Sequence, residues 1–500
     1  MGQIPTKTLE DLEYPEVLRQ YADFAITPLG KTACLGIVPE VDKELILDQL
    51  QAVSEFRASF DNENRIPNHG FESLTEVFAL LKIENSVLEM HTFSNIAANT
   101  EITNTLLAFL KKFQTYYPTL YNRSEGLTIE KEIKSSVDSV IDRFGEVRDN
   151  ASESLYSIRK KIQQLRGKIS SSFNKALSQY QNADYLDDIR ESIVDNRRVL
   201  AVKAMHRRKV KGTIMGSSKT GSIVFIEPET THAQTQELQN LLFEEGEEIK
   251  KILSQLTDFF RPYLPYLELQ QAFLLELDLI YAKARYAQEI KGLLPEMVVD
   301  SHEMDFKNAY HPLLLQAHKL EGKVTHPQDI RLDAAHRIIV ISGPNAGGKS
   351  ITLKTVGLLQ LMLQSGMLIP VHERSKACLF DRILTDIGDN QSIENHLSTY
   401  SYRLKNMKYF LRKCDSNTLF LIDEFGTGSD PELGGALAEV ILEDFYEREA
   451  YGLITTHYAN LKVLATELPA IINANMQFDN QTLEPVFKLI LGEAGSSFTF

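Results

Sequence analysis

Apolar residues recur every three or four positions through about the first 125 residues, for example in LEDLEYPEVLRQYADFAI and LILDQLQAVSEF. This spacing predicts helices with one buried face. Pro28, Pro39 and the polar stretch DNENRIPNHG interrupt the pattern and predict connections between helices. We therefore expect a helical core over residues 1–126.

The helical spacing continues beyond this core and predicts one long amphipathic helix, or two joined near Gly145. Residues 197–228 are rich in valine and isoleucine and contain the turn GSSKTGS, which predicts a small β-rich element. A second helical run begins near His232. Since the chain goes out along one helical run and returns along another, we expect helical lever arms over residues 127–292, with a β clamp tip at about 197–228.

Roughly the last 200 residues contain the short apolar runs RIIVIS, TLFLID and YGLITT, which alternate with helical stretches. This alternation is typical of an α/β domain with a largely parallel sheet. We expect such a domain over residues 293–500. The whole chain is thus predicted to be an α + α/β multidomain protein.

Composition narrows the class of protein. With 43% hydrophobic and 24% charged residues, the 500-residue chain can bury several cores. Cys34, Cys378 and Cys414 have neither a paired nor a metal-binding spacing, which favours a reducing, cytoplasmic compartment. No apolar run is long enough for a membrane helix, so no membrane partner is expected. The formal net charge of −15 opposes indiscriminate binding to nucleic acid, so any such contact must be local.

Basic residues gather in the predicted tip. No acidic residue lies between Arg197 and Lys211, so this segment could neutralise several phosphate groups of DNA. Because aromatic residues are not interleaved with the basic ones, duplex backbone is a better match than single strands. The alternative is a solvated hairpin whose charges keep an exposed sheet edge from aggregating. The candidate nucleic-acid-binding residues are Arg197, Arg198, Lys203, Arg207, Arg208, Lys209 and Lys211.

The run RIIVIS leads into a glycine-rich sequence that fits GxxxxGK[ST] between a predicted strand and a predicted helix. In this context backbone N–H groups can surround phosphates, Lys349 can reach the β and γ oxygens, and the Ser350 hydroxyl can ligate Mg²⁺. We therefore expect ATP and Mg²⁺ as cofactors. The candidate nucleotide-binding residues of this loop are Gly343, Pro344, Asn345, Ala346, Gly347, Gly348, Lys349 and Ser350.

Two further apolar runs end in polar residues that suit hydrolysis. TLFLID ends at Asp423, which is expected to hold Mg²⁺, and Glu424 follows as a general base for the attacking water. YGLITT leads to His457, which can hydrogen-bond a γ-phosphate when it is neutral. The candidate catalytic residues of this Mg²⁺-dependent ATPase are Glu424, His457 and Lys349, and the candidate metal ligands are Ser350 and Asp423.

Four motifs in order, GPNAGGKS, DIGDNQSIENHLSTYSYRL, LFLIDEFGTGSDPELGGALAE and TTHYANLK, resemble the ATPase motifs of the MutS family. They most resemble its second branch, MutS-two, which lacks the mismatch-reading N-terminal domains. The resemblance is dense over about residues 310–500, whereas the helical body and arm resemble the family's core, lever and clamp more loosely. It implies an ABC-type P-loop ATPase domain that works in a homodimer, with nucleotide between the subunits.

The resemblance also implies roles for individual residues. Ser398 corresponds to the signature serine that touches the γ-phosphate of the opposite subunit, and His311 belongs to an element near the nucleotide base. Asp386 and Gln391 fall where the family couples nucleotide state to the arms. The loop 426–430 resembles the segment that links the two sites across the interface.

Two departures limit what the resemblance implies. Phe243-Glu244-Glu245 fits the string of the family's mismatch wedge but lies in the returning helix, where we expect core packing, so mismatch recognition is not expected. MutS-two proteins usually continue into a dimerising segment, a linker and a small Smr nuclease domain, whereas this chain stops in what resembles the closing segment of the ATPase domain. We expect either a fragment or a lost nuclease, and no nuclease site in these 500 residues.

Three functions fit these observations. The first is an ATP-driven dimeric clamp that closes on branched recombination DNA, to suppress recombination or assist repair. The second keeps the same motor but grips rRNA and splits stalled or collided ribosomes. A third, a structural ATPase of the Rad-fifty or condensin type, is disfavoured, because those proteins place the phosphate loop before a very long coiled coil, whereas here the arm precedes Gly343.

Overall fold

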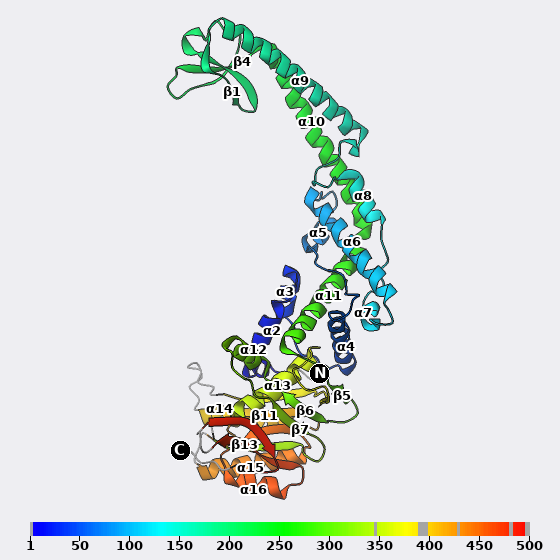
Figure 1. Ribbon diagram of the computed structural model, residues 1–500, viewed down its shortest axis with the longest axis vertical. Helices are drawn as coiled ribbons and strands as arrows, with labels where there is room; N and C mark the ends of the chain where they lie inside the picture. Colours follow the sequence, from blue (N-terminus) through cyan, green and yellow to red (C-terminus); the bar gives the residue numbers. More distant parts are fainter. Residues whose placement is uncertain (1–3, 345–347, 389–398, 428–430, 480–483, 496–500) are drawn as a thin grey trace. The chain divides into compact units, whose positions relative to one another are not determined.

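The computed structural model describes residues 4–344, 348–388, 399–427, 431–479 and 484–495 (Figure 1). Contacts between residues divide the chain into two compact units. The first unit comprises Met1–Gly70, Thr105–Leu127 and Ala272–Phe500, and the second comprises Phe71–Asn104 and Thr128–Gln271. Helices α6 (Met90–Lys112) and α11 (Leu264–Ile290) contribute residues to both units. The division into three domains at residues 126 and 292 stays a prediction.

Short helices form the N-terminal part of the first unit: α1 (Thr6–Asp11), α2 (Tyr14–Ala22), α3 (Pro28–Leu35), α4 (Lys43–Ser59) and α7 (Pro118–Asn122). Side chains cap two of their N-terminal ends. The Thr27 hydroxyl accepts a hydrogen bond from the Gly30 N–H, and the Asp42 carboxylate accepts from the N–H groups of Glu44 and Leu45. The predicted helical character of this region is confirmed.

A six-stranded sheet lies in the C-terminal part of the first unit, in the order β10-β11-β12-β8-β13-β14. Its strands are β8 (Ile338–Ser342), β10 (Arg382–Asp386), β11 (Thr418–Ile422), β12 (Tyr451–Thr455), β13 (Ile471–Asp479) and β14 (Glu484–Leu491). All neighbouring strands are parallel except β13 and β14. Every residue of β8, β11 and β12 is buried, as expected for strands covered on both faces. The predicted α/β arrangement with a largely parallel sheet is confirmed.

Four helices alternate with these strands: α13 (Lys349–Gln364), α14 (Thr399–Lys413), α15 (Pro431–Glu447) and α16 (Ala459–Glu467). Helix α13 follows β8 and is buried along most of its length. Phe420 of β11 packs against Phe445 of α15, with 4.5 Å between their ring centroids. The same unit contains α12 (Pro312–Glu321) and a second sheet in the order β5-β9-β6-β7, formed by β5 (Glu296–Met297), β6 (Met304–Ala309), β7 (Gln328–Leu332) and β9 (Lys376–Ala377).

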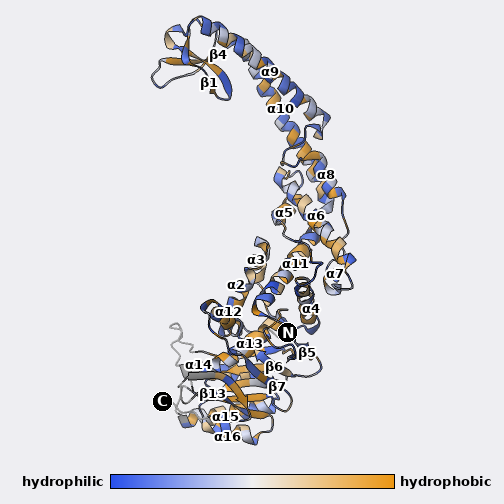
Figure 2. Ribbon diagram, in the orientation of Figure 1, coloured by the Kyte–Doolittle hydropathy of each residue, from blue (hydrophilic) through white to orange (hydrophobic). Residues whose placement is uncertain are grey.

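The second unit contains two long helices joined by an antiparallel sheet (Figure 1). Helix α9 (Glu153–Asn182) leads into β1 (Leu186–Val194), β2 (Arg197–Lys203), η2 (Ala204–His206), β3 (Gly212–Ser217) and β4 (Ile223–Pro228), and α10 (Glu229–Phe260) follows. The sheet order is β1-β2-β4-β3. Phe173 of α9 is fully buried in a cluster with Leu200 and Ile226 of the sheet. Figure 2 shows hydrophilic residues recurring along both helices, with hydrophobic residues between them.

The remaining elements of the second unit are α5 (Thr75–Leu81), α8 (Glu132–Val140), η1 (Asp149–Ala151) and η3 (Arg261–Tyr263). The long helical run forms two helices, α8 and α9, and Gly145 between them has a φ of 83°. The structure therefore confirms the two-helix alternative.

Two expectations for the second unit are corrected. Strand β1 lies outside the β-rich element that was predicted for residues 197–228. Most of its side chains are exposed or half-buried, so it lacks the apolar alternation that marks a strand in a sequence. Phe243 was expected to pack in the core but is 71% exposed on α10. It occupies the helix as predicted, on the face that does not pack.

Other structural features bear on the classes of site considered above. Cys34, Cys378 and Cys414 are buried and unpaired. Within the described ranges, no three His, Cys, Asp or Glu side chains group closely enough to hold a metal ion by themselves. A search of the same residues finds no helix with the length and apolar character needed to cross a membrane.

Candidate functional site

The glycine-rich loop begins where β8 ends and finishes where α13 begins. Gly343 and Gly348 have φ values of 134° and 96°, a region that side chains with a Cβ disfavour. A Cβ on Gly343 would lie 3.1 Å from the Met476 carbonyl oxygen, and one on Gly348 would lie 2.9 Å from the Phe487 ring. Both positions therefore require glycine. Asn345, Ala346 and Gly347 lie outside the described residues.

Lys349 is the first residue of α13 and is only 3% exposed. Its ammonium group donates a hydrogen bond to the Gly343 carbonyl oxygen at 2.5 Å. Burial lowers its pKa to about 8, although the charges of Asp423 and Glu424 act in the opposite direction. A buried cation at the N-terminal end of a helix suits a phosphate group. Ser350 follows it and is exposed, so its hydroxyl is accessible.

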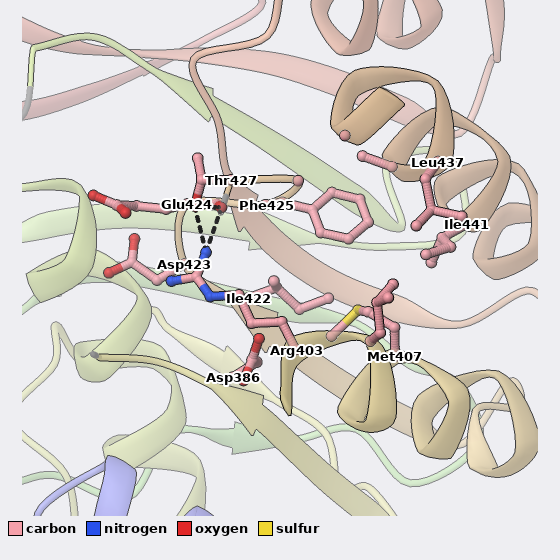
Figure 3. Close-up of a pocket in the computed structure, with 14 residues that line it drawn as sticks. Asp386, Arg403, Met407, Ile422, Asp423, Glu424, Phe425, Thr427, Leu437 and Ile441 are labelled. Carbon is pink, nitrogen blue, oxygen red and sulfur yellow. Dashed lines mark hydrogen bonds between the residues drawn. The ribbon is translucent and has the colours of Figure 1, made fainter. Parts of the chain in front are cut away.

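The acidic pair lies at the end of β11. The Thr455 hydroxyl donates to Asp423 Oδ1 at 2.6 Å and accepts from the Glu424 N–H at 2.8 Å. The Asp423 N–H donates to the Asp386 carbonyl oxygen at 2.9 Å. Figure 3 shows both carboxylates pointing to the same side, away from Phe425. Two acidic side chains are thus presented together on one side of this turn.

His457 follows β12 and is the fourth member of this group. Its Nε2 is buried and has no hydrogen-bond partner among the described residues. Burial lowers the pKa of His457, and the neighbouring charge of Lys349 lowers it further. The imidazole is therefore neutral near pH 7 and has one nitrogen available for a ligand.

These four residues come together because their strands are neighbours. Lys349 follows β8, Asp423 and Glu424 follow β11, and His457 follows β12, which lies between β11 and β8. The three strands are parallel, so their carboxyl ends lie at the same edge of the sheet. Ligands of open α/β sheets bind at this edge.

Other predicted residues of the site are placed differently or not described. His311 is the N-cap residue of α12, where its side chain accepts a hydrogen bond from the Leu314 N–H at 3.5 Å. Burial lowers the pKa of His311 to about 4. No hydrogen bond joins it to the described part of the glycine-rich loop, and its role near a nucleotide base stays a prediction. Ser398 and Gln391 lie outside the described residues, as do three residues of the loop 426–430.

Two residues near the acidic pair were not singled out in the sequence. Arg403 of α14 donates from Nη1 to the Glu424 carbonyl oxygen at 3.0 Å (Figure 3). Asn406 of the same helix donates to Asp386 Oδ1 at 2.9 Å. Arg403 also lines a largely apolar cavity of about 30 Å³, together with Met407. Arg403 lies within the second motif and Asn406 follows shortly after it, but the motif by itself assigns neither residue a role.

The structure divides the basic residues of the predicted tip into two groups. Three are paired with carboxylates: Arg197 with Glu227 at 2.9 Å, Arg198 with Glu191 at 2.5 Å, and Lys203 with Asp184 at 2.9 Å. Arg198 also lies over the Phe173 ring at 4.2 Å. The other four are exposed in the turn from η2 to β3, without an ion pair to any described residue: Arg207, Arg208, Lys209 and Lys211. We call these four the basic turn.

Aromatic rings lie beside the basic turn, which the sequence did not indicate. Tyr185 lies 4.8 Å from the His206 ring and 6.4 Å from the Tyr180 ring, and Lys209 lies over Tyr185 at 5.2 Å. Tyr180 and Tyr185 flank the end of α9 and are far from the basic turn in sequence, so the sequence did not reveal that they lie beside it. All three rings are half-buried, so they support the turn and expose part of their surface.

Comparison with known proteins shows what the chain is similar to in sequence. The family model described as MutS domain V matches residues 339–499. Endonuclease MutS2 of Lacticaseibacillus casei (strain BL23) is 34% identical over 99% of this chain and 62% of its own length. Putative endonuclease MutS2 of Bacillus subtilis (strain 168) is 35% identical over the same shares of the two chains. The chain thus spans less than two thirds of the length of these curated relatives.

Proposed function

The chain belongs to the MutS family, and we propose that it is an Mg²⁺-dependent ATPase whose helical arm binds nucleic acid. The observation that carries the proposal is the group of Lys349, Asp423, Glu424 and His457 at one edge of the parallel sheet. A buried cation, two carboxylates and a neutral imidazole are the groups that phosphoryl transfer to water needs.

The residues of the loop would bind the phosphates of ATP. Backbone N–H groups at the start of α13 and the Lys349 ammonium attract negative charge there. The unpartnered Nε2 of His457 would donate a hydrogen bond to the terminal phosphate. A buried polar atom without a partner is costly, so a ligand oxygen at this position stabilises the site.

The metal ligands also fit the proposal. Asp423 offers a carboxylate and Ser350 an accessible hydroxyl, and Mg²⁺ is commonly held by one or two protein oxygens together with phosphates and water. When bound, the ion would neutralise charge on the phosphates. Thr455 fixes the Asp423 carboxylate in place through its 2.6 Å hydrogen bond.

Glu424 would act as the general base. Its carboxylate lies on the same side as that of Asp423, where it can accept a proton from the water that attacks the terminal phosphate (Figure 3). In the homodimer implied for this family, Ser398 of the partner subunit would complete the site. ATP between the subunits would then favour one geometry of the arms, and hydrolysis would release it.

The basic turn would contact the nucleic-acid backbone. Its four exposed cations carry local positive charge on a chain with a net charge of −15. We propose branched DNA as the ligand, and recombination control or repair as the role. Ribosomal RNA in stalled ribosomes is the alternative, because the phosphate chemistry is shared.

Two substitutions test the ATPase. Glu424→Ala is expected to abolish turnover while it retains ATP binding, because the base does not hold the phosphates. Lys349→Ala is expected to weaken ATP binding itself. Steady-state hydrolysis and equilibrium binding of a fluorescent ATP analogue would measure both effects. Normal turnover by the Glu424→Ala protein would contradict the assignment of the base.

A charge-reversed protein tests the nucleic-acid site. Arg207, Arg208 and Lys209 are replaced together by glutamate, and a control protein carries the same change at three exposed lysines of α9, Lys160, Lys161 and Lys168. Competition between branched DNA, linear duplex and collided ribosomes would be measured with Glu424→Ala protein held in ATP and Mg²⁺. Loss of binding only in the first protein supports the basic turn, and equal binding by both contradicts it. Preferential binding to ribosomes would contradict DNA as the ligand and support ribosomal RNA instead.

A further inference from the structure

We infer that Arg403 is a positioning residue, which holds the turn that carries Glu424 and so sets the rate of hydrolysis. The inference rests on the proposed ATPase function. It concerns a residue of the second motif to which no role is assigned above. Its basis is the set of hydrogen bonds that Arg403 makes with the turn that follows Asp423.

The contacts of Arg403 converge on one carbonyl group. Arg403 Nη1 donates to the Glu424 carbonyl oxygen at 3.0 Å and also to the Thr427 hydroxyl. Thr427 donates to the same carbonyl oxygen from its N–H at 3.2 Å and from its hydroxyl at 2.9 Å. Three donors therefore fix the orientation of a single peptide group.

This peptide group needs such support because of its backbone conformation. Glu424 has a φ of 50°, in the left-handed region that residues with a Cβ rarely adopt. A turn in this region persists only when its surroundings hold it. Because the backbone and the side chain share the Cα atom, this backbone conformation also determines where the Glu424 side chain points. Loss of Arg403 would let the turn relax and move the carboxylate away from its position beside Asp423.

Helix α14 also supports the acidic pair through Asp386 of β10. Asn406 donates to Asp386 Oδ1 at 2.9 Å, and the Asp386 carbonyl oxygen accepts from the Asp423 N–H at 2.9 Å. Arg403 and Asn406 are three positions apart and therefore lie on one face of α14. The helix thus supports Glu424 directly and Asp423 through Asp386.

Arg403 makes no hydrogen bond to the described part of the glycine-rich loop or to Lys349. Its guanidinium lies beside the small cavity lined by Met407, Phe425 and Leu437 (Figure 3). The residues proposed to bind the phosphates are thus different from those that hold Glu424, the proposed general base. The effect of Arg403 should fall on the rate of the chemical step and leave ATP affinity nearly unchanged.

The test compares Arg403→Met, Arg403→Lys and a control, Arg412→Met, which lies on the exposed face of the same helix. We expect Arg403→Met to lower kcat by about 100-fold, the size of effect that a small displacement of a catalytic group produces, with KM and ATP affinity within about twofold. Arg403→Lys keeps a donor and should recover part of kcat. Arg412→Met should match the unaltered protein.

Circular dichroism and thermal denaturation would show that each variant folds. A kcat for Arg403→Met within about threefold of the unaltered protein would overturn the inference, as would an equal loss of ATP affinity and kcat. If Arg403→Met does not fold, Arg403→Lys decides, since a positioning role requires a reduced kcat at unchanged ATP affinity. Absence of hydrolysis in the unaltered protein would instead contradict the proposed function.

Discussion

Thr455 joins the two acidic residues of the proposed site, and its replacement by valine is the sharpest test of the geometry. The residue is fully buried at the end of β12. Its hydroxyl donates to Asp423 Oδ1 at 2.6 Å and accepts from the Glu424 N–H at 2.8 Å. Thr455→Val removes both hydrogen bonds with little change in side-chain shape.

The size of the effect follows from these two bonds. A hydrogen bond to a charged group contributes about 1.5–3 kcal/mol, and a buried N–H without a partner costs about 1–3 kcal/mol. We therefore expect the first unit to lose about 3 kcal/mol of stability. Both acidic residues also lose the group that orients them, so kcat should fall by at least roughly 100-fold, or about 2.7 kcal/mol in the activation free energy.

Thr418→Val is a matched control. Thr418 is fully buried at the opposite end of the neighbouring strand β11, where its hydroxyl donates to Asp415 at 2.8 Å and accepts from the Asp415 N–H at 3.2 Å. Urea denaturation and steady-state ATP hydrolysis would be measured for both variants. The control should lose stability but keep its kcat. Equal kcat values for the two variants would refute the role of Thr455 in orienting the acidic pair.

Three further outcomes are expected. ATP affinity, measured by titration calorimetry, should fall as the pH rises above about 8, because Lys349 loses its charge there. In urea denaturation, Gly357→Ala should destabilise the protein by about 1–3 kcal/mol, because the new Cβ would lie 2.6 Å from a leucine side chain. Gly167→Ala should instead stabilise α9 by about 0.5–1 kcal/mol, because no atom lies within 4 Å of the new Cβ. Arg207→Gln should reduce the slope of the logarithm of the DNA-binding constant against the logarithm of salt concentration by about 0.9 for each tip that contacts DNA. Arg198→Gln should leave this slope unchanged.

The sequence singled out the main residues of the candidate site, but not the contacts that hold them. The motifs identify Lys349, Asp423 and Glu424 because each follows an apolar run that forms a buried strand. The strand order β10-β11-β12-β8 could not be predicted, because periodicity marks a strand without naming its neighbours. Thr455 can contact both acidic residues only because β12 lies beside β11. Its role, like that of Arg403, therefore appears only in the structure.

In the basic tip, too, the sequence could not show which charged residues pair with one another. Seven cations near one another in sequence suggested a single surface, but the antiparallel pairing of the sheet brings acidic residues from other strands against two of them, and Asp184, which precedes β1, pairs with Lys203. Glu227 of β4 is 1% exposed and pairs with Arg197, and Glu191 of β1 pairs with Arg198. These pairs stabilise the sheet and leave the positive charge in the turn that follows η2. A strongly acidic protein can thus keep a short cationic surface at the end of its arm, which favours contact with a phosphate backbone there and opposes it elsewhere.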